Sequence, residues 1–99
     1  MSSAKLKDRW DAFSHRPFPA DYGGVDINGV CVTMTDSFVA GCVVSFISCG
    51  SLDPERIAIL KRCRDDLDLV LPGLKGRSHN YFAELGSFAD EVLVQVVRR

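Results

Sequence analysis

The sequence predicts a mainly α-helical protein: a small bundle of about four helices around a central apolar helix, with a possible short β-hairpin at about residues 25–34. Apolar residues recur every three or four positions in several segments, which is the period of a helix with one buried face. Between Asp26 and Asp53 the only formal charge is Asp36, so one segment is apolar enough for the centre of a bundle. The chain has 99 residues, 46% apolar and 25% charged, which predicts a single domain over residues 1–99.

The first predicted helix covers about residues 3–14. Leu6, Trp10 and Phe13 follow one another at helical spacing and form one apolar face. The helix ends before Pro17 and Pro19, because the residue that precedes a proline is pushed toward extended geometry.

The predicted hairpin is centred on Asn28-Gly29, which is a strong turn signal because both middle residues of a type I′ turn need positive φ. The residues that follow alternate up to Met34, as in a strand. Such a hairpin is too short to be stable alone, so it must pack on helices or find a partner strand.

The central helix is predicted between Asp36, as its N-terminal cap, and Gly50, as its stop signal. Its apolar residues fall on more than one stripe, so we expect it to be covered nearly all round. We favour a buried helix over a membrane span, because the uncharged run from Ser37 to Leu52 includes Ser45, Ser48 and Ser51 and lacks flanking Lys or Arg anchors.

Two more helices are predicted in the second half of the chain. Asp53 and Pro54 are typical of the cap and first position of a helix that runs to Pro72. On the solvent-exposed face of this helix, a basic residue is followed four positions later by an acidic one in three pairs: Lys61 with Asp65, Arg62 with Asp66 and Arg64 with Asp68. The last helix is capped by Ser78. Its end, residues 92–97, is β-branched enough to be a strand, but helix is favoured because the apolar stripe stays in phase.

Charge and cysteine content exclude several classes. With 12 Lys+Arg against 13 Asp+Glu the net charge is −1, which provides no general field for capturing a nucleic acid. Cys31, Cys42, Cys49 and Cys63 form no CxxC pair, so we expect no zinc site and interpret Cys42 and Cys49 as buried thiols. The first residues lack the apolar core of a secretory signal, which predicts a cytoplasmic protein.

No motif in the sequence indicates catalysis or a cofactor. His15 and His79 are the only histidines, the first lying in a proline loop and the second at a helix start, and neither has a nucleophile or metal-ligand partner at a suitable spacing. The glycine-bearing loops do not match a phosphate-binding pattern. The sequence therefore predicts a protein that is not an enzyme and uses no metal or cofactor.

The most distinctive predicted surface feature is the acidic group Asp65, Asp66 and Asp68. One interpretation is a solvated helix face that balances the neighbouring bases. The other is a partner-binding rim for a basic protein, such as the active-site face of a nuclease, because complementary charge speeds association.

A set of glycine, capping and core positions resembles a pattern in small bacterial proteins, some of which are similar to immunity proteins of contact-dependent growth inhibition systems. The pattern comprises Asn28-Gly29-Val30, Asp36, Ala40-Gly41-Cys42-Val43, Leu52-Asp53, Arg56, Ile59-Leu60, Cys63, Leu67, Val70-Leu71-Pro72, Tyr81-Phe82 and Leu85. The resemblance implies a non-enzymatic inhibitor that binds and neutralises a cognate toxin domain. The alternative is a small regulatory or assembly module that homodimerises through the hairpin edge or an apolar helix face, so both a monomer and a homodimer remain open.

Overall fold

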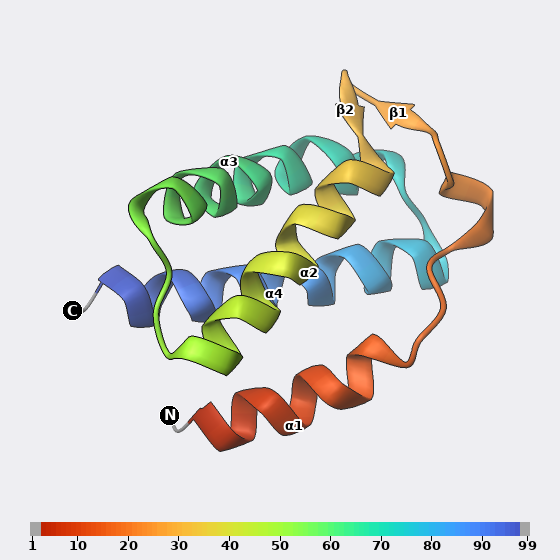
Figure 1. Ribbon diagram of the computed structural model, residues 1–99. Helices are drawn as coiled ribbons and strands as arrows, with labels where there is room; N and C mark the ends of the chain where they lie inside the picture. Colours follow the sequence, from red (N-terminus) through yellow and green to blue (C-terminus); the bar gives the residue numbers. More distant parts are fainter. Residues whose placement is uncertain (1–2, 98–99) are drawn as a thin grey trace.

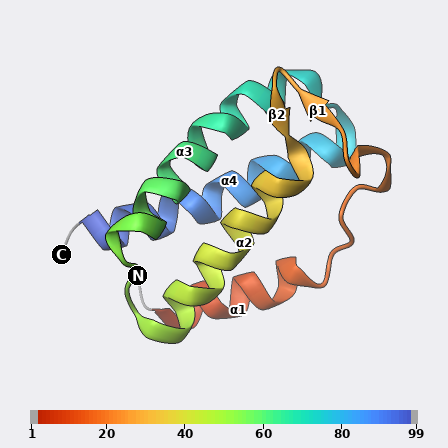
Figure 2. The same cartoon turned by 45° about the horizontal axis from the view of Figure 1, so that its top comes forward.

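The computed structural model describes residues 3–97 and confirms a small helical bundle with a β-hairpin (Figure 1). In chain order the elements are α1 (Ser3–Ser14), a 3-10 turn (Ala20–Tyr22), β1 (Asp26–Ile27), β2 (Val30–Cys31), α2 (Val32–Cys49), α3 (Pro54–Val70), a second 3-10 turn (Leu71–Gly73) and α4 (Gly76–Val97). Both views place α2 between α3 and α1, with α4 crossing behind it (Figures 1 and 2).

The helix α1 is joined to α4 by aromatic rings. Trp10 meets Phe88 edge-on with 5.1 Å between ring centroids, and Phe13 lies 4.9 Å from the ring of Tyr81. At the edge of this seam Arg9 pairs with Glu91 at 2.8 Å. The predicted apolar face of the first helix is therefore buried against α4, and aromatic pairs of this geometry add to the area that they bury.

The hairpin is confirmed but is shorter than predicted. Asn28 and Gly29 both have positive φ, at 50° and 82°, and the register pairs Asp26 with Cys31. Met34 belongs to α2 and not to a strand. The segment is helical because Val32, the first residue of α2, is buried, and a helix that starts at Val32 places this residue on the same buried face as the turns that follow.

Two helix starts were predicted wrongly and one correctly. Asp53 caps α3 by accepting a hydrogen bond from the backbone N–H of Arg56 at 2.7 Å. Asp36 is not a cap, because α2 already begins at Val32 and the Asp36 side chain is bound instead by Tyr81. Ser78 is not a cap either, since α4 starts at Gly76, two residues earlier. At both wrong starts the helix extends upstream over residues that the sequence assigned to a strand or a turn.

The end of α4 settles the choice left open for residues 92–97, because the segment is helical to Val97. Val92 is fully buried, in phase with Phe88 and Leu85 on the same stripe. Packing of that stripe outweighs the β-branched composition of the last turns.

The prediction that the apolar helix is covered on all sides is wrong. Met34, Phe38 and Val44 of α2 are 55%, 45% and 49% exposed. Within residues 3–97, α2 is the one helix long and apolar enough to span a membrane, judged by length and composition alone, and 33% of it is buried. Its opposite side packs on α3 and α4, so α2 is only partly buried and presents an uncharged, largely apolar side to solvent.

Candidate protein-binding surface

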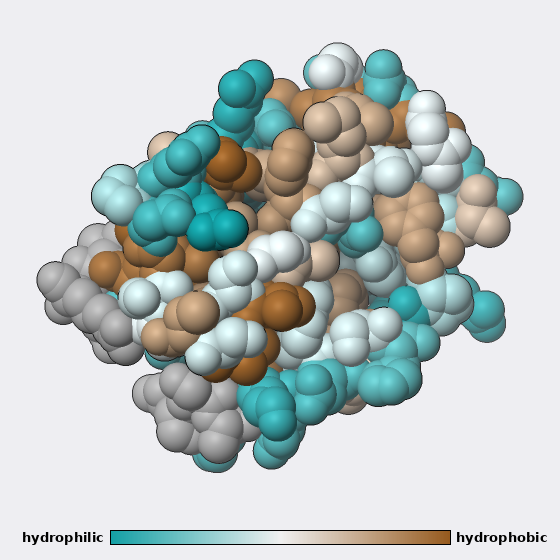
Figure 3. Space-filling view, viewed as in Figure 1, coloured by the Kyte–Doolittle hydropathy of each residue, from teal (hydrophilic) through white to brown (hydrophobic). Residues whose placement is uncertain are grey.

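The exposed side of α2 carries no formal charge and combines large apolar side chains with the hydroxyls of Ser37 and Ser48. Met34 and Phe38 lie one turn apart on it, and Gly41 follows in the next turn. Figure 3 shows this pale and brown surface over α2, above the hydrophilic strip contributed by α1. The single acid of the helix, Asp36, is turned into the bundle toward Tyr81. We call Met34, Phe38, Gly41 and Val44 the α2 face.

Nothing in the described part of the chain explains the glycine in this face. A Cβ placed on Gly41 would have nothing within 4 Å, and its φ is not in the left-handed range. Glycine inside a helix costs about 1 kcal/mol relative to alanine. Gly41 therefore lowers the stability of α2 without helping this chain to pack.

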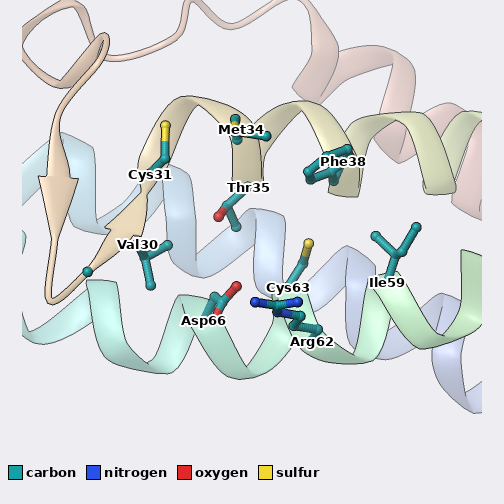
Figure 4. Close-up of a pocket in the computed structure, with 10 residues that line it drawn as sticks. Val30, Cys31, Met34, Thr35, Phe38, Ile59, Arg62, Cys63 and Asp66 are labelled. Atoms are coloured by element: carbon teal, nitrogen blue, oxygen red, sulfur yellow. The ribbon is translucent and has the colours of Figure 1, made fainter.

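A groove of about 440 Å³ lies next to the α2 face, between α2 and α3 (Figure 4). Met34 and Phe38 form its wall on α2, and Ile59 stands opposite on α3. Two charges, Arg62 and Asp66, border it on α3. The groove thus combines apolar walls with one cation and one anion, which is typical of a surface that receives an amphipathic partner.

Thr35 supplies a polar group in the floor of the groove. Its side chain extends from α2 toward α3, on the side where Asp66 extends toward α2 (Figure 4). The residue is 4% exposed, and its hydroxyl makes no hydrogen bond within residues 3–97. A hydroxyl that lines a groove and has no protein partner can hydrogen-bond to water or to a bound molecule.

The thiols of Cys42 and Cys63 are buried between α2 and α3, and their pKa values are raised. Burial and the nearby Asp66 raise the pKa of Cys63 to about 11, and burial also raises the pKa of Cys42. A thiol that stays protonated at neutral pH is a poor nucleophile. The prediction that Cys42 is buried is confirmed, whereas the same prediction for Cys49 is wrong, because Cys49 lies about three turns after Phe38 on the same uncovered side of α2.

The three predicted acidic residues do not form one patch. Asp66 borders the groove, whereas Asp68 pairs with Arg64 at 2.9 Å, and Arg64 also binds Asp90 of α4 at 2.7 Å. Each helical residue turns by about 100°, so Asp66 and Asp68 point about 160° apart. Asp65 is exposed between these two directions.

Of the three predicted base–acid pairs on α3, the structure forms only the one between Arg64 and Asp68. In the described part of the chain Arg62 and Asp66 make no ion pair with each other. Both charges at the groove are therefore unpaired in the single chain.

A second polar cluster runs from the partly buried Asp36 and Tyr81 to the surface pair Arg16 and Glu84. The Tyr81 hydroxyl donates to an Asp36 carboxylate oxygen at 2.8 Å, and Arg16 lies over the Tyr81 ring while it pairs with Glu84 at 2.9 Å. Burial raises the pKa of Asp36, although the hydrogen bond from Tyr81 acts in the opposite direction. Burial, together with the Asp36 carboxylate, also raises the pKa of Tyr81. The cluster joins α2 to α4 and does not open into the groove.

The two histidines are not combined with other reactive groups. The His15 ring nitrogen Nδ1 lies 2.6 Å from the backbone carbonyl oxygen of Asp11, one turn earlier in the chain. His79 lies in the first turns of α4, where its backbone N–H donates to the carbonyl of Lys75. Among the described residues no group of three or more His, Cys, Asp or Glu side chains could hold a metal ion.

Comparison of the chain with protein-family models, with curated proteins and with solved structures found no match.

Sequence reasoning missed the two residues that dominate this surface, Met34 and Phe38. Met34 was assigned to a strand, and Phe38 was placed on a buried stripe of the central helix. One signal could have indicated the exposed side: Ser37, Gly41 and Ser48 are small or polar and recur at helical spacing, opposite the bulky residues Val39, Val43 and Phe46.

Proposed function

We propose that this protein is a non-enzymatic binding protein that recognises another protein through the α2 face and the adjoining groove. The observation that carries the proposal is the solvent exposure of Met34 and Phe38 on a helix side without charge. Exposed apolar groups gathered beside a groove are typical of interaction sites, whereas single scattered ones are not. Large side chains of Met and aromatic residues are also the types enriched at protein interfaces.

In its specific form the proposal is an immunity-type inhibitor in the bacterial cytoplasm that covers a cognate toxin domain. Such a protein needs a folded scaffold and a specific surface, and no catalytic group. Because Asp66 and Arg62 are the two charges that border the groove, the toxin surface we expect is mainly apolar with one complementary base and one complementary acid. This replaces a broad basic nuclease face as the expected partner surface.

The test is protection of growth. A toxin gene encoded next to the gene for this protein is expressed in cells with the wild-type protein, with Met34→Asp or with Phe38→Asp. We expect wild type to protect and both variants to fail, because a charge placed in the centre of an apolar interface is left without a partner.

Val94→Asp is the matched control, because Val94 is 50% exposed on α4 and does not line the groove. It introduces the same charge at a comparable exposure and is expected to protect like wild type. Circular dichroism of all variants separates lost binding from lost folding. Absence of a neighbouring toxin gene, or equal protection by all variants, contradicts the proposal.

A further inference from the structure

We propose that the α2 face and the groove also bind a second copy of this chain, in a homodimer with a two-fold axis that crosses the groove near Thr35. This goes beyond the proposed function, since it concerns the protein in the absence of any other partner. It rests on the distribution of charge and apolar surface around the groove.

The two groove charges are arranged so that the surface is complementary to itself. Arg62 and Asp66 are one turn apart on α3, about 6 Å along the helix axis. Both line the groove together with Cys63, which lies between them in the sequence (Figure 4). We place the two-fold axis perpendicular to α3, running across the groove and midway between Arg62 and Asp66. Arg62 of each copy then lies opposite Asp66 of the other copy. Two ion pairs form that the single chain lacks.

The same axis also pairs the apolar residues. Met34 and Phe38 on α2 lie across the groove from Asp66 and Arg62 on α3, and they are also one turn apart (Figure 4). An axis that passes midway between Arg62 and Asp66 therefore passes close to the midpoint of Met34 and Phe38. It places Met34 of each copy opposite Phe38 of the other, so one operation satisfies both the charged and the apolar pairs.

Gly41 and the overall charge are consistent with a second copy. Gly41 extends the α2 face by one turn with open space above it, so another backbone can approach closely there. A net charge of −1 leaves little repulsion between two copies. A lipid surface is the other occupant to consider, but hydrocarbon offers no counterpart for Arg62 and Asp66, which a second copy pairs.

The experiment measures the mass of the full chain in solution by sedimentation equilibrium, from micromolar to millimolar concentration. We expect the wild type to associate reversibly to a dimer. Arg62→Glu and Asp66→Arg should each weaken self-association by about tenfold or more, because each places like charges opposite one another. Mixed in equal amounts, the two variants should form a heterodimer, because the glutamate introduced in one chain then lies opposite the arginine introduced in the other.

Lys61→Glu and Asp65→Arg are the matched controls. They make the same changes of charge one residue away, on exposed positions of α3 outside the groove. They should leave the dissociation constant of the dimer within about twofold of wild type. Circular dichroism again checks that all variants are folded.

Several results would overturn the inference. They are a wild type that stays monomeric at every concentration, controls that weaken association as much as the groove variants, and variants that fail to associate when mixed. A monomer that sediments with phosphatidylglycerol vesicles would assign the α2 face to a membrane instead.

This outcome is independent of the growth test. If the protein is a monomer and still protects cells, the dimer proposal is refuted and the inhibitor proposal stands. If the protein is a dimer and protects against no toxin, the inhibitor proposal is refuted and the dimer proposal stands. If both hold, a toxin domain must displace the second copy, because the two partners occupy the same face.

Discussion

Replacement of Tyr81 by Phe tests the cluster that joins α2 to α4. The change removes one hydroxyl and keeps the ring, whose contacts with Phe13 and Phe82 at 4.9 Å and 5.0 Å between centroids do not need it. The hydroxyl donates to Asp36 at 2.8 Å, and Tyr81 is 8% exposed. The substitution therefore leaves the Asp36 carboxylate without this donor.

A hydrogen bond to a charged group contributes about 1.5–3 kcal/mol. Water reaches part of Asp36, which is only half buried, so we expect a loss near the lower limit, about 1.5 kcal/mol. In an Asp36→Asn background the lost bond is to a neutral acceptor, and the loss should fall to about 0.5–1 kcal/mol.

The loss should also depend on pH. The pKa of Asp36 in the folded protein is raised above its ordinary value of 3.8, so the folded state binds this proton more readily than the unfolded chain. The contribution of Asp36 to stability is therefore highest at acid pH and is lost as the pH rises through the folded-state pKa. Without the Tyr81 donor this pKa rises further. The effect of Tyr81→Phe should thus be greatest at neutral pH and shrink as the pH falls toward 3.8.

The assay is urea denaturation followed by the fluorescence of Trp10, the only tryptophan, which is buried against Phe88. A fixed, low protein concentration keeps self-association out of the measured free energy. The reasoning is refuted if Tyr81→Phe is as stable as wild type at neutral pH. It is equally refuted if the loss is the same in the Asp36→Asn background or does not change with pH.

Three further predictions concern single positions. Gly41→Ala should stabilise the monomer by about 0.5–1 kcal/mol, because the added methyl group meets only open space and the helix gains propensity; destabilisation in urea would contradict an uncovered α2 face. In the native protein a disulfide reagent should modify exposed Cys49 rapidly and leave Cys63 unmodified, and Cys49→Ser should remove the fast phase. Asp53→Ala should cost about 1 kcal/mol of stability through loss of the helix cap. Asp53→Asn should cost much less, because an amide oxygen still caps the helix and the exposed ion pair with Arg56 contributes little. Equal losses of stability in the two variants would show that the ion pair dominates.

Many of the helix ends and the hairpin turn could be predicted from the sequence, because each depends on a few neighbouring residues. Asp53 and Pro54 start α3, Gly50 with its φ of 75° ends α2, and Asn28 with Gly29 makes the hairpin turn. These signals work because each depends on one or two residues whose backbone preferences or hydrogen bonds are satisfied within a few positions. The buried stripe of α4 is readable for a similar reason, since its period persists for several turns.

The residues that form the candidate binding surface could not be predicted as well from the sequence. Asp65, Asp66 and Asp68 are neighbours in sequence, yet they face different sides of α3, and only Asp66 meets the groove. Adjacency in the chain does not mean adjacency on a helix, because successive side chains point about 100° apart. Conversely, Met34 and Arg62 are far apart in sequence and come together only because α2 packs on α3.

The sequence by itself determined which segments are helices and where several of them begin and end, because propensity, capping and periodicity act over a few residues. It also determined that α2 is apolar and nearly uncharged. Only the tertiary structure decided that one side of α2 is uncovered, that Asp36 is held by Tyr81, and that Arg62 and Asp66 border a groove beside Met34 and Phe38. The physical reason is that exposure belongs to the packed assembly: a helix that is apolar on all sides can be buried only where neighbours reach it, and three helices reach only part of α2.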